Sequence, residues 1–113
     1  MITLWHNPRC SKSRAALALL MKGDVPLTVR RYLLDVPNVI EIEAAITALD
    51  IAPIELMRRG EAVFKELGLT PDSPPKTLVQ ALADHPILIE RPIAFQGSRA
   101  VIGRPPEAVL ELL

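Results

Sequence analysis

The chain has little of several residue types that define common protein classes. Among its 113 residues are one cysteine, two histidines and only 4% aromatic residues, and 13 basic residues balance 13 acidic ones. A single cysteine excludes an internal disulfide framework, and one cysteine with two scattered histidines gives no metal-ligand pattern. A formal net charge of zero provides no whole-molecule field that would attract nucleic acid or an anionic membrane.

Long apolar runs are missing as well. No window reaches the roughly 18 apolar residues of a membrane span, and Met1–Trp5 lacks the basic region and long apolar segment of a targeting sequence. We therefore expect a cytoplasmic protein, and the single cysteine fits a reducing compartment. Hydrophobic residues make up 50% of the sequence, which is typical of a compact fold. The length suits one domain, residues 1–113.

The first third of the chain predicts a βαβ unit. Ile2–Trp5 is an apolar strand, Ser11–Lys22 is a helix that Gly23 stops, and Leu27–Arg31 alternates apolar and polar residues as a second strand. Two strands joined by a helix in this way form a parallel pair with a right-handed crossover.

The remaining segments predict helices followed by a β-hairpin. Asn38 begins a helical region with a capping-box spacing, and this region extends to about residue 84. Pro92–Phe95 and Arg99–Ile102 are predicted hairpin strands, and Glu107–Leu113 is a predicted closing helix. The order βαβ…ββα indicates an α/β fold with a thioredoxin/glutaredoxin-like four-stranded mixed sheet. The helical segment, about 38–84, is inserted between its halves.

Cys10 lies where the first strand turns into the first helix. A thiol at a helix N-terminus faces unpaired N–H groups and the positive end of the helix dipole. The nearby cations Arg9, Lys12 and Arg14 also favour the thiolate, which is the nucleophile of thiol chemistry. A small buried hydrophobe is the alternative, but this position favours a reactive, at least partly accessible thiol. With no second cysteine, any disulfide formed in a reaction cycle involves an outside partner.

Three arginines stand at element boundaries, where loops deliver side chains to a shared site: Arg58, Arg91 and Arg104. In a thioredoxin-like topology the start of the first helix and the start of the hairpin lie side by side, so Cys10 and Arg91 should meet. Guanidinium groups bind oxyanions through paired hydrogen bonds. Two like charges about 4 Å apart repel by about 1–4 kcal/mol. A thiolate therefore needs such cations to accept an oxyanion. Taken singly, each arginine is better explained as a solvated surface group, and the three become candidates only in combination with Cys10.

Other side chains near Cys10 are weaker candidates for tuning its thiolate. His6 could tune it or serve as a structural hydrogen-bond partner. Asn7 and Ser13 could orient the thiolate or cap the turn and helix. Arg14 could add positive charge.

Five short motifs occur in the order found in a known family. They are His6-Asn7-Pro8-x-Cys10-x-x-Ser13-Arg14, Leu56-Met57-Arg58, Glu66-Leu67-Gly68-Leu69, His85-Pro86-Ile87-Leu88-Ile89-x-Arg91-Pro92-Ile93, and Gly103-Arg104-Pro105. On these motifs the chain resembles the glutaredoxin-coupled arsenate reductases of the ArsC type. Within that family it looks like the shorter, chromosomally encoded branch.

The resemblance implies a role for each matched residue. Cys10 corresponds to the nucleophile that attacks arsenate, and Arg58, Arg91 and Arg104 to the arginines that bind the oxyanion. His6 would help to keep the thiolate charged.

The resemblance also implies a cis-proline and outside partners. Pro92 corresponds to the structural cis-proline of thioredoxin-like folds. Glutathione as co-substrate and then glutaredoxin would resolve the arsenic adduct, which answers the missing second cysteine. No tightly bound cofactor, metal, nucleic acid or membrane is implied, and we expect a monomer.

Two other functions stay open on the sequence. Related Spx-like thioredoxin-fold regulators bind RNA polymerase, many through a Cys-x-x-Cys switch, but position 13 here is Ser13. A non-catalytic protein that binds a thiol partner is the second alternative.

Overall fold

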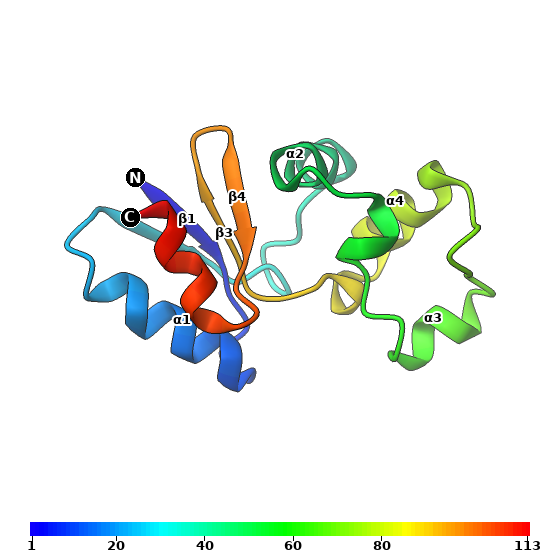
Figure 1. The fold of residues 1–113 in the computed structure, drawn as a ribbon. Coiled ribbons are helices and arrows are strands. Elements are labelled where there is room, and N and C mark those ends of the chain that lie inside the picture. Colours follow the sequence, from blue (N-terminus) through cyan, green and yellow to red (C-terminus); the bar gives the residue numbers. More distant parts are fainter. The chain divides into compact units, whose positions relative to one another are not determined.

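The computed structural model describes all residues, 1–113, and contains one four-stranded sheet (Figure 1). The chain divides into two compact units. Unit 1 consists of residues 1–35 and 91–113, and unit 2 of residues 36–90. Unit 2 covers the whole of the predicted helical insert, about 38–84, and continues beyond it at both ends.

Unit 1 contains the sheet, whose strand order is β2-β1-β3-β4. Its strands are β1 (Ile2–Trp5), β2 (Leu27–Arg30), β3 (Ile93–Gln96) and β4 (Arg99–Ile102). β1 pairs with β2 in parallel and with β3 antiparallel, and β3 and β4 form an antiparallel hairpin. The predicted four-stranded mixed sheet and its βαβ unit are therefore confirmed.

Two helices complete unit 1. α1 (Ser11–Met21) connects β1 to β2, and η3 (Pro106–Leu112) ends the chain. They pack against each other (Figure 1). Their apolar side chains bury those of the sheet in one core: Ile2, Leu4, Ala16, Leu20, Ala94, Val109 and Leu112. The closing helix differs from the sequence prediction in type, because η3 is a 3₁₀ helix of 7 residues, which is longer than is usual for this helix type.

Unit 2 is helical. Its elements are α2 (Val39–Leu49), η1 (Pro53–Leu56), α3 (Ala62–Glu66), α4 (Pro75–Asp84) and η2 (Pro86–Leu88). The capping box predicted at the start of α2 is present. The Asn38 side chain accepts a hydrogen bond from the Glu41 backbone N–H at 2.8 Å, and the Glu41 carboxylate accepts one from Asn38 at 3.1 Å.

None of the helices is both long and apolar enough to cross a membrane. Nowhere do three or more His, Cys, Asp or Glu side chains gather as a possible metal-ligand set.

Candidate active site around Cys10

Cys10 occupies the N-cap of α1, as the sequence predicted. Its backbone is extended (φ −94°, ψ 123°), and its carbonyl accepts the first helical hydrogen bond, from Arg14 N–H at 3.0 Å. Its own N–H donates to the Asn7 carbonyl at 3.0 Å, which closes the turn between β1 and α1. The side chain is 9% exposed. Cys10 is therefore buried, and the thiol is less accessible than the at least partly accessible side chain expected from the sequence.

The loop before Cys10 is organised around Ser13. A buried hydrogen bond of 2.7 Å joins His6 Nδ1 to Ser13 Oγ, and the Asn7 backbone N–H donates to the same oxygen at 3.0 Å. None of these hydrogen bonds ends on the Cys10 sulfur. His6, Asn7 and Ser13 thus fix the shape of the loop that carries Cys10, and their predicted tuning of the thiolate stays a prediction.

His6 is buried in a positively charged neighbourhood. Burial lowers the pKa of His6 below its ordinary value, and the charges of Arg31 and Arg14 lower it further. The imidazole is therefore held in its neutral form. The Ser13 hydroxyl accepts from the Asn7 N–H, and the direction of its bond to Nδ1 depends on the tautomer of the neutral ring, because the oxygen has a second lone pair as well as its own proton.

Arg14 stays close to the cysteine loop through a backbone contact. Its guanidinium donates to the Pro8 carbonyl at 2.9 Å. This bond ties the first turn of α1 to the preceding loop and keeps a cation beside Cys10, where the sequence placed one.

Arg91 and Arg104 lie together at the sheet edge from which the Cys10 loop starts. Ile93 pairs with Trp5 at the end of β1, and with Ile102 at the end of β4. Arg91 comes just before β3 and Arg104 just after β4. Both therefore lie at the end of the sheet where β1 also ends. There the Arg104 Nε donates to the Arg91 carbonyl oxygen at 2.8 Å.

The same edge holds two cis peptide bonds. The bond between Arg91 and Pro92 is cis, as predicted, and a second cis bond, which the sequence analysis missed, precedes Pro105. Gly103 fits closely against the first of these prolines: its N–H donates to the Pro92 carbonyl at 2.8 Å. A Cβ on Gly103 would lie 2.7 Å from Pro92 Cγ, so no larger residue fits there without a shift.

Arg58 belongs to unit 2, where two carboxylates flank it. Its Nη1 lies 2.6 Å from Glu61 Oε1, and its Nε lies 3.9 Å from Glu90 Oε1. All three side chains are about a quarter exposed. The sequence analysis missed both acidic partners, although the three-residue spacing of Arg58 and Glu61 was a usable signal. That Arg58 joins Cys10 in one site stays a prediction.

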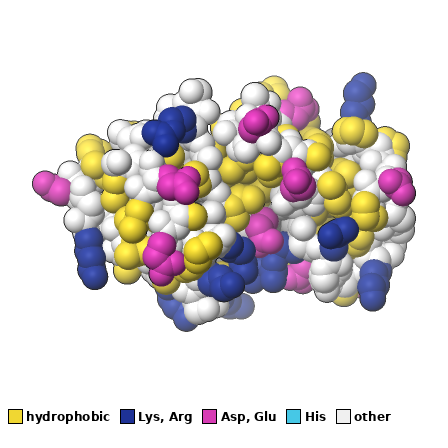
Figure 2. Space-filling view, viewed as in Figure 1, with side chains coloured by type: hydrophobic (Ala, Val, Ile, Leu, Met, Phe, Trp, Pro, Cys, Tyr) yellow, Lys and Arg dark blue, Asp and Glu magenta, His cyan; other side chains and the backbone are white.

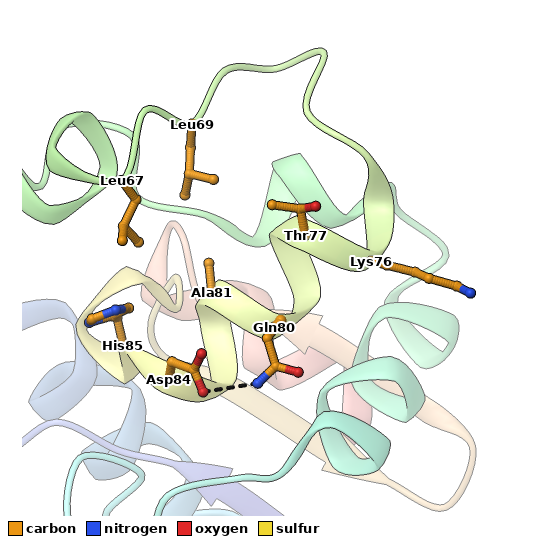
Figure 3. Close-up of a pocket in the computed structure, with 8 residues that line it drawn as sticks. All are labelled: Leu67, Leu69, Lys76, Thr77, Gln80, Ala81, Asp84 and His85. Atoms are coloured by element: carbon orange, nitrogen blue, oxygen red, sulfur yellow. Dashed lines mark hydrogen bonds between the residues drawn. The ribbon is translucent and has the colours of Figure 1, made fainter.

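A cavity in unit 2 offers no comparable chemistry. Its volume is about 410 Å³, and Leu67, Leu69 and Ala81 form its apolar wall (Figure 3). On the polar side, the Gln80 amide donates to Asp84 at 2.9 Å. None of the candidate site residues lines this cavity.

The chain is similar to several known proteins over nearly its whole length. The ArsC family model matches residues 5–112. The chain is 41% identical to an arsenate reductase of Neisseria meningitidis over 99% of this chain and 97% of that protein. It is 40% identical to an arsenate reductase of Haemophilus influenzae over 99% and 98% of the two chains.

A solved structure extends the likeness to three dimensions. The arsenate reductase from Vibrio cholerae superposes with a TM-score of 0.94 at 41% identity, covering 99% of this chain and 97% of that one. The shared architecture is thioredoxin-like, which confirms the fold expected from the sequence.

Proposed function

This chain belongs to the ArsC family, and from that membership we propose that it is an arsenate reductase with Cys10 as its nucleophile. The observation that carries the proposal is the position of Cys10 at the N-cap of α1. The loop that holds it starts from the sheet edge where Arg91 and Arg104 meet. The names of relatives about 40% identical over nearly their whole length support the same reaction.

Binding of the oxyanion is the first requirement. Arsenate is doubly charged near neutral pH and repels a thiolate, so cations must hold the two together. Arg91 and Arg104 are suited to this because a guanidinium keeps its charge and donates paired hydrogen bonds to two oxygens. The N-terminus of α1 adds unpaired N–H groups that favour negative charge.

A covalent step follows. The Cys10 thiolate attacks the As(V) atom and forms a sulfur–arsenic bond, while one arsenate oxygen takes up protons and leaves as water. No electrons are transferred to arsenic in this step, so arsenic is still As(V) in the adduct.

Reduction needs a second thiol, because Cys10 is the only cysteine. We propose glutathione as this co-substrate. Its sulfur attacks the Cys10 sulfur, the electron pair of the sulfur–arsenic bond goes to arsenic, and arsenite leaves as As(III). Cys10 is then a mixed disulfide with glutathione, and a glutaredoxin thiol removes the glutathione and restores Cys10. We further propose that the protein acts as a cytoplasmic monomer without a tightly bound cofactor.

A coupled assay tests this proposal. The purified protein is mixed with arsenate, glutathione, glutaredoxin, glutathione reductase and NADPH, and NADPH oxidation is followed. We expect oxidation that depends on arsenate and is lost in Cys10→Ser, because serine keeps the shape but cannot supply the thiolate. Unfolding curves of both proteins show whether the variant keeps its fold. Wild-type protein that oxidises no NADPH in response to arsenate would contradict the proposal.

A further inference from the structure

A second cavity opens in unit 1 beside the loop that leads to Cys10. Its volume is about 280 Å³. Residues 6–9 of the loop after β1 form one wall, and Arg31, Leu33 and Leu34 after β2 form the other. No acidic side chain lines it. We refer to it below as the Arg9–Arg31 cavity.

The two arginines of this cavity have unused hydrogen-bonding capacity. The side chains of Arg9 and Arg31 are exposed, and neither guanidinium forms an ion pair or a hydrogen bond within the protein. Their neighbours differ, since Arg14 donates to a backbone carbonyl and Arg30 pairs with Asp35 at 3.3 Å. Two guanidinium groups that have no partner within the protein can both donate hydrogen bonds to an anionic ligand in this cavity.

The surroundings strengthen this positive character. Residues 1–23 contain no Asp or Glu, and Figure 2 shows Lys and Arg side chains gathered along the lower edge of the view, where α1 begins. Arg31 also contributes to lowering the pKa of the neighbouring His6, after burial. The positive potential therefore reaches the wall of the cavity itself.

The apolar wall indicates what kind of anion fits. Leu33 is 39% exposed and Leu34 80% exposed, and Pro8 continues the apolar surface. A bare tetrahedral oxyanion would leave this surface in contact with water. Small-molecule sites usually combine such apolar area with a few placed polar groups and begin at about 300 Å³. The combination suits a small peptide that carries carboxylates.

We infer that the Arg9–Arg31 cavity binds the thiol co-substrate, a short carboxylate-bearing peptide thiol. Its carboxylates lie on Arg9 and Arg31, and its apolar part lies against Leu33 and Leu34. Arg9 directly precedes Cys10 in the chain, so a ligand held there lies beside the loop that carries the adduct it must resolve. This inference rests on the proposed function, which supplies the need for such a thiol.

Steady-state kinetics with glutathione test the inference. Arg31→Gln and Arg9→Gln should each raise the KM for glutathione about three- to tenfold, because each loses an exposed charge-assisted contact. In Arg31→Gln the KM for arsenate should stay at the wild-type value. The matched control is Arg59→Gln, which removes another exposed arginine without an ion pair, outside the cavity, and should leave both constants unchanged.

The chemistry of the ligand gives a second comparison. Glutathione whose carboxylates are esterified should react poorly with the wild type and equally poorly with Arg31→Gln, because the contact that the variant removes is already absent. If the arginine variants raise the KM for arsenate and leave that for glutathione unchanged, the cavity serves the oxyanion and the inference is wrong.

Binding without turnover separates this inference from the proposed function. S-methylglutathione has no free thiol, so it can bind without reacting. Titrated into the wild type and followed by NMR, it should shift the backbone signals of residues 6–9 and 31–34, and it should not do so in Arg31→Gln. If these signals do not move while arsenate reduction by glutathione is normal, the cavity inference fails and the proposed function stands. If they move and arsenate is not reduced, the proposed function alone fails.

Discussion

Arg58 in unit 2 and Arg104 in unit 1 donate to different kinds of acceptor. In unit 2, Arg58 faces the carboxylates of Glu61 and Glu90. In unit 1, the Arg104 Nε donates to the backbone carbonyl of Arg91. A carboxylate offsets much of the charge of a guanidinium that it holds. Glu61 and Glu90 should therefore lower the contribution of Arg58 to anion binding.

The largest effect expected is at the two arginines of unit 1. Arg91→Ala and Arg104→Ala should each lower kcat/KM for arsenate by roughly ten- to a hundredfold or more, because a charge-assisted contact is worth about 1.5–3 kcal/mol. Replacement by lysine should recover only part of the loss, since an ammonium keeps the charge but not the planar pair of donors. Steady-state kinetics in the coupled assay measure both.

The control for this prediction is Arg99→Ala on β4. Arg99 is exposed and donates to the Glu111 carbonyl at 3.0 Å. Its loss should leave kcat/KM nearly unchanged. Equal kinetics for the alanine variants of Arg91, Arg104 and Arg99 would remove the electrostatic role assigned to unit 1 and favour a protein that binds partners without catalysis.

A second contrast between the units concerns glycines. Gly103 of unit 1 has Pro92 Cγ 2.7 Å and Val109 Cγ1 3.1 Å from where its Cβ would lie, while Gly60 of unit 2 has nothing within 4 Å. Gly103→Ala should destabilise the protein by about 1–3 kcal/mol, the usual cost of overpacking. Gly60→Ala should be neutral or slightly stabilising because it restricts the unfolded chain. Urea unfolding measures the stability of both variants. Similar midpoints would mean that Pro92 and Val109 shift at little cost to make room for the added methyl group.

Local signals explain why much of this architecture could be predicted from sequence. The capping box at Asn38 and Glu41 involves neighbours in the chain, and the position of Cys10 at the start of α1 follows from the strand-to-helix change around it. Alternating apolar residues and Gly97 in the hairpin turn, with φ 59°, likewise specify the hairpin locally.

The contacts that the sequence did not predict depend on folding and on side-chain rotamers. Glu90 is distant from Arg58 in the chain, and only folding of unit 2 brings their side chains to 3.9 Å. Ser13 was expected to orient the thiolate or cap the turn and helix, and the sequence did not indicate that its hydroxyl bonds His6 and the Asn7 backbone. The expected and the observed contacts of Ser13 are both compatible with the same residue types at the same spacing.

A smaller effect, confined to acidic pH, is expected from His6 in unit 1. Burial, Arg31 and Arg14 hold its pKa below the ordinary value of 6.5 in the folded protein. Below pH 6.5 the unfolded chain binds a proton that the folded chain does not. The stability that neutral His6 supports is therefore complete above that pH and is lost as pH falls through the folded pKa.

The comparison for this prediction is His6→Asn with the wild type. Asparagine does not titrate and keeps a polar group near Ser13. His6→Asn should therefore flatten the fall in unfolding free energy between about pH 7.5 and 5. A wild-type profile in His6→Asn would show that His6 does not contribute to acid sensitivity.

The smallest effect expected concerns the carboxylates of unit 2, and it tests the comparison between the units directly. Glu61→Gln keeps the size and a hydrogen-bond acceptor beside Arg58 Nη1 but removes the charge that offsets it. If Arg58 contacts the oxyanion, this change should lower the KM for arsenate, because more of its positive charge is available. A partly exposed ion pair is worth about 0.2–1 kcal/mol, so the expected decrease is about two- to fivefold at most.

A double variant, Glu61→Gln combined with Arg58→Ala, shows whether Glu61 affects the KM for arsenate through Arg58. In Arg58→Ala the same Glu61→Gln change should leave the KM for arsenate unmoved, because the charge that it would release is gone. Glu66→Gln, on the exposed side of α3, should be neutral in both backgrounds. A KM that rises in Glu61→Gln would instead show that Glu61 holds Arg58 in its working position. A decrease that persists without Arg58 would show that Glu61 acts only through the general field of the protein. In either case, the charge that Glu61 offsets on Arg58 would not explain how the oxyanion is bound.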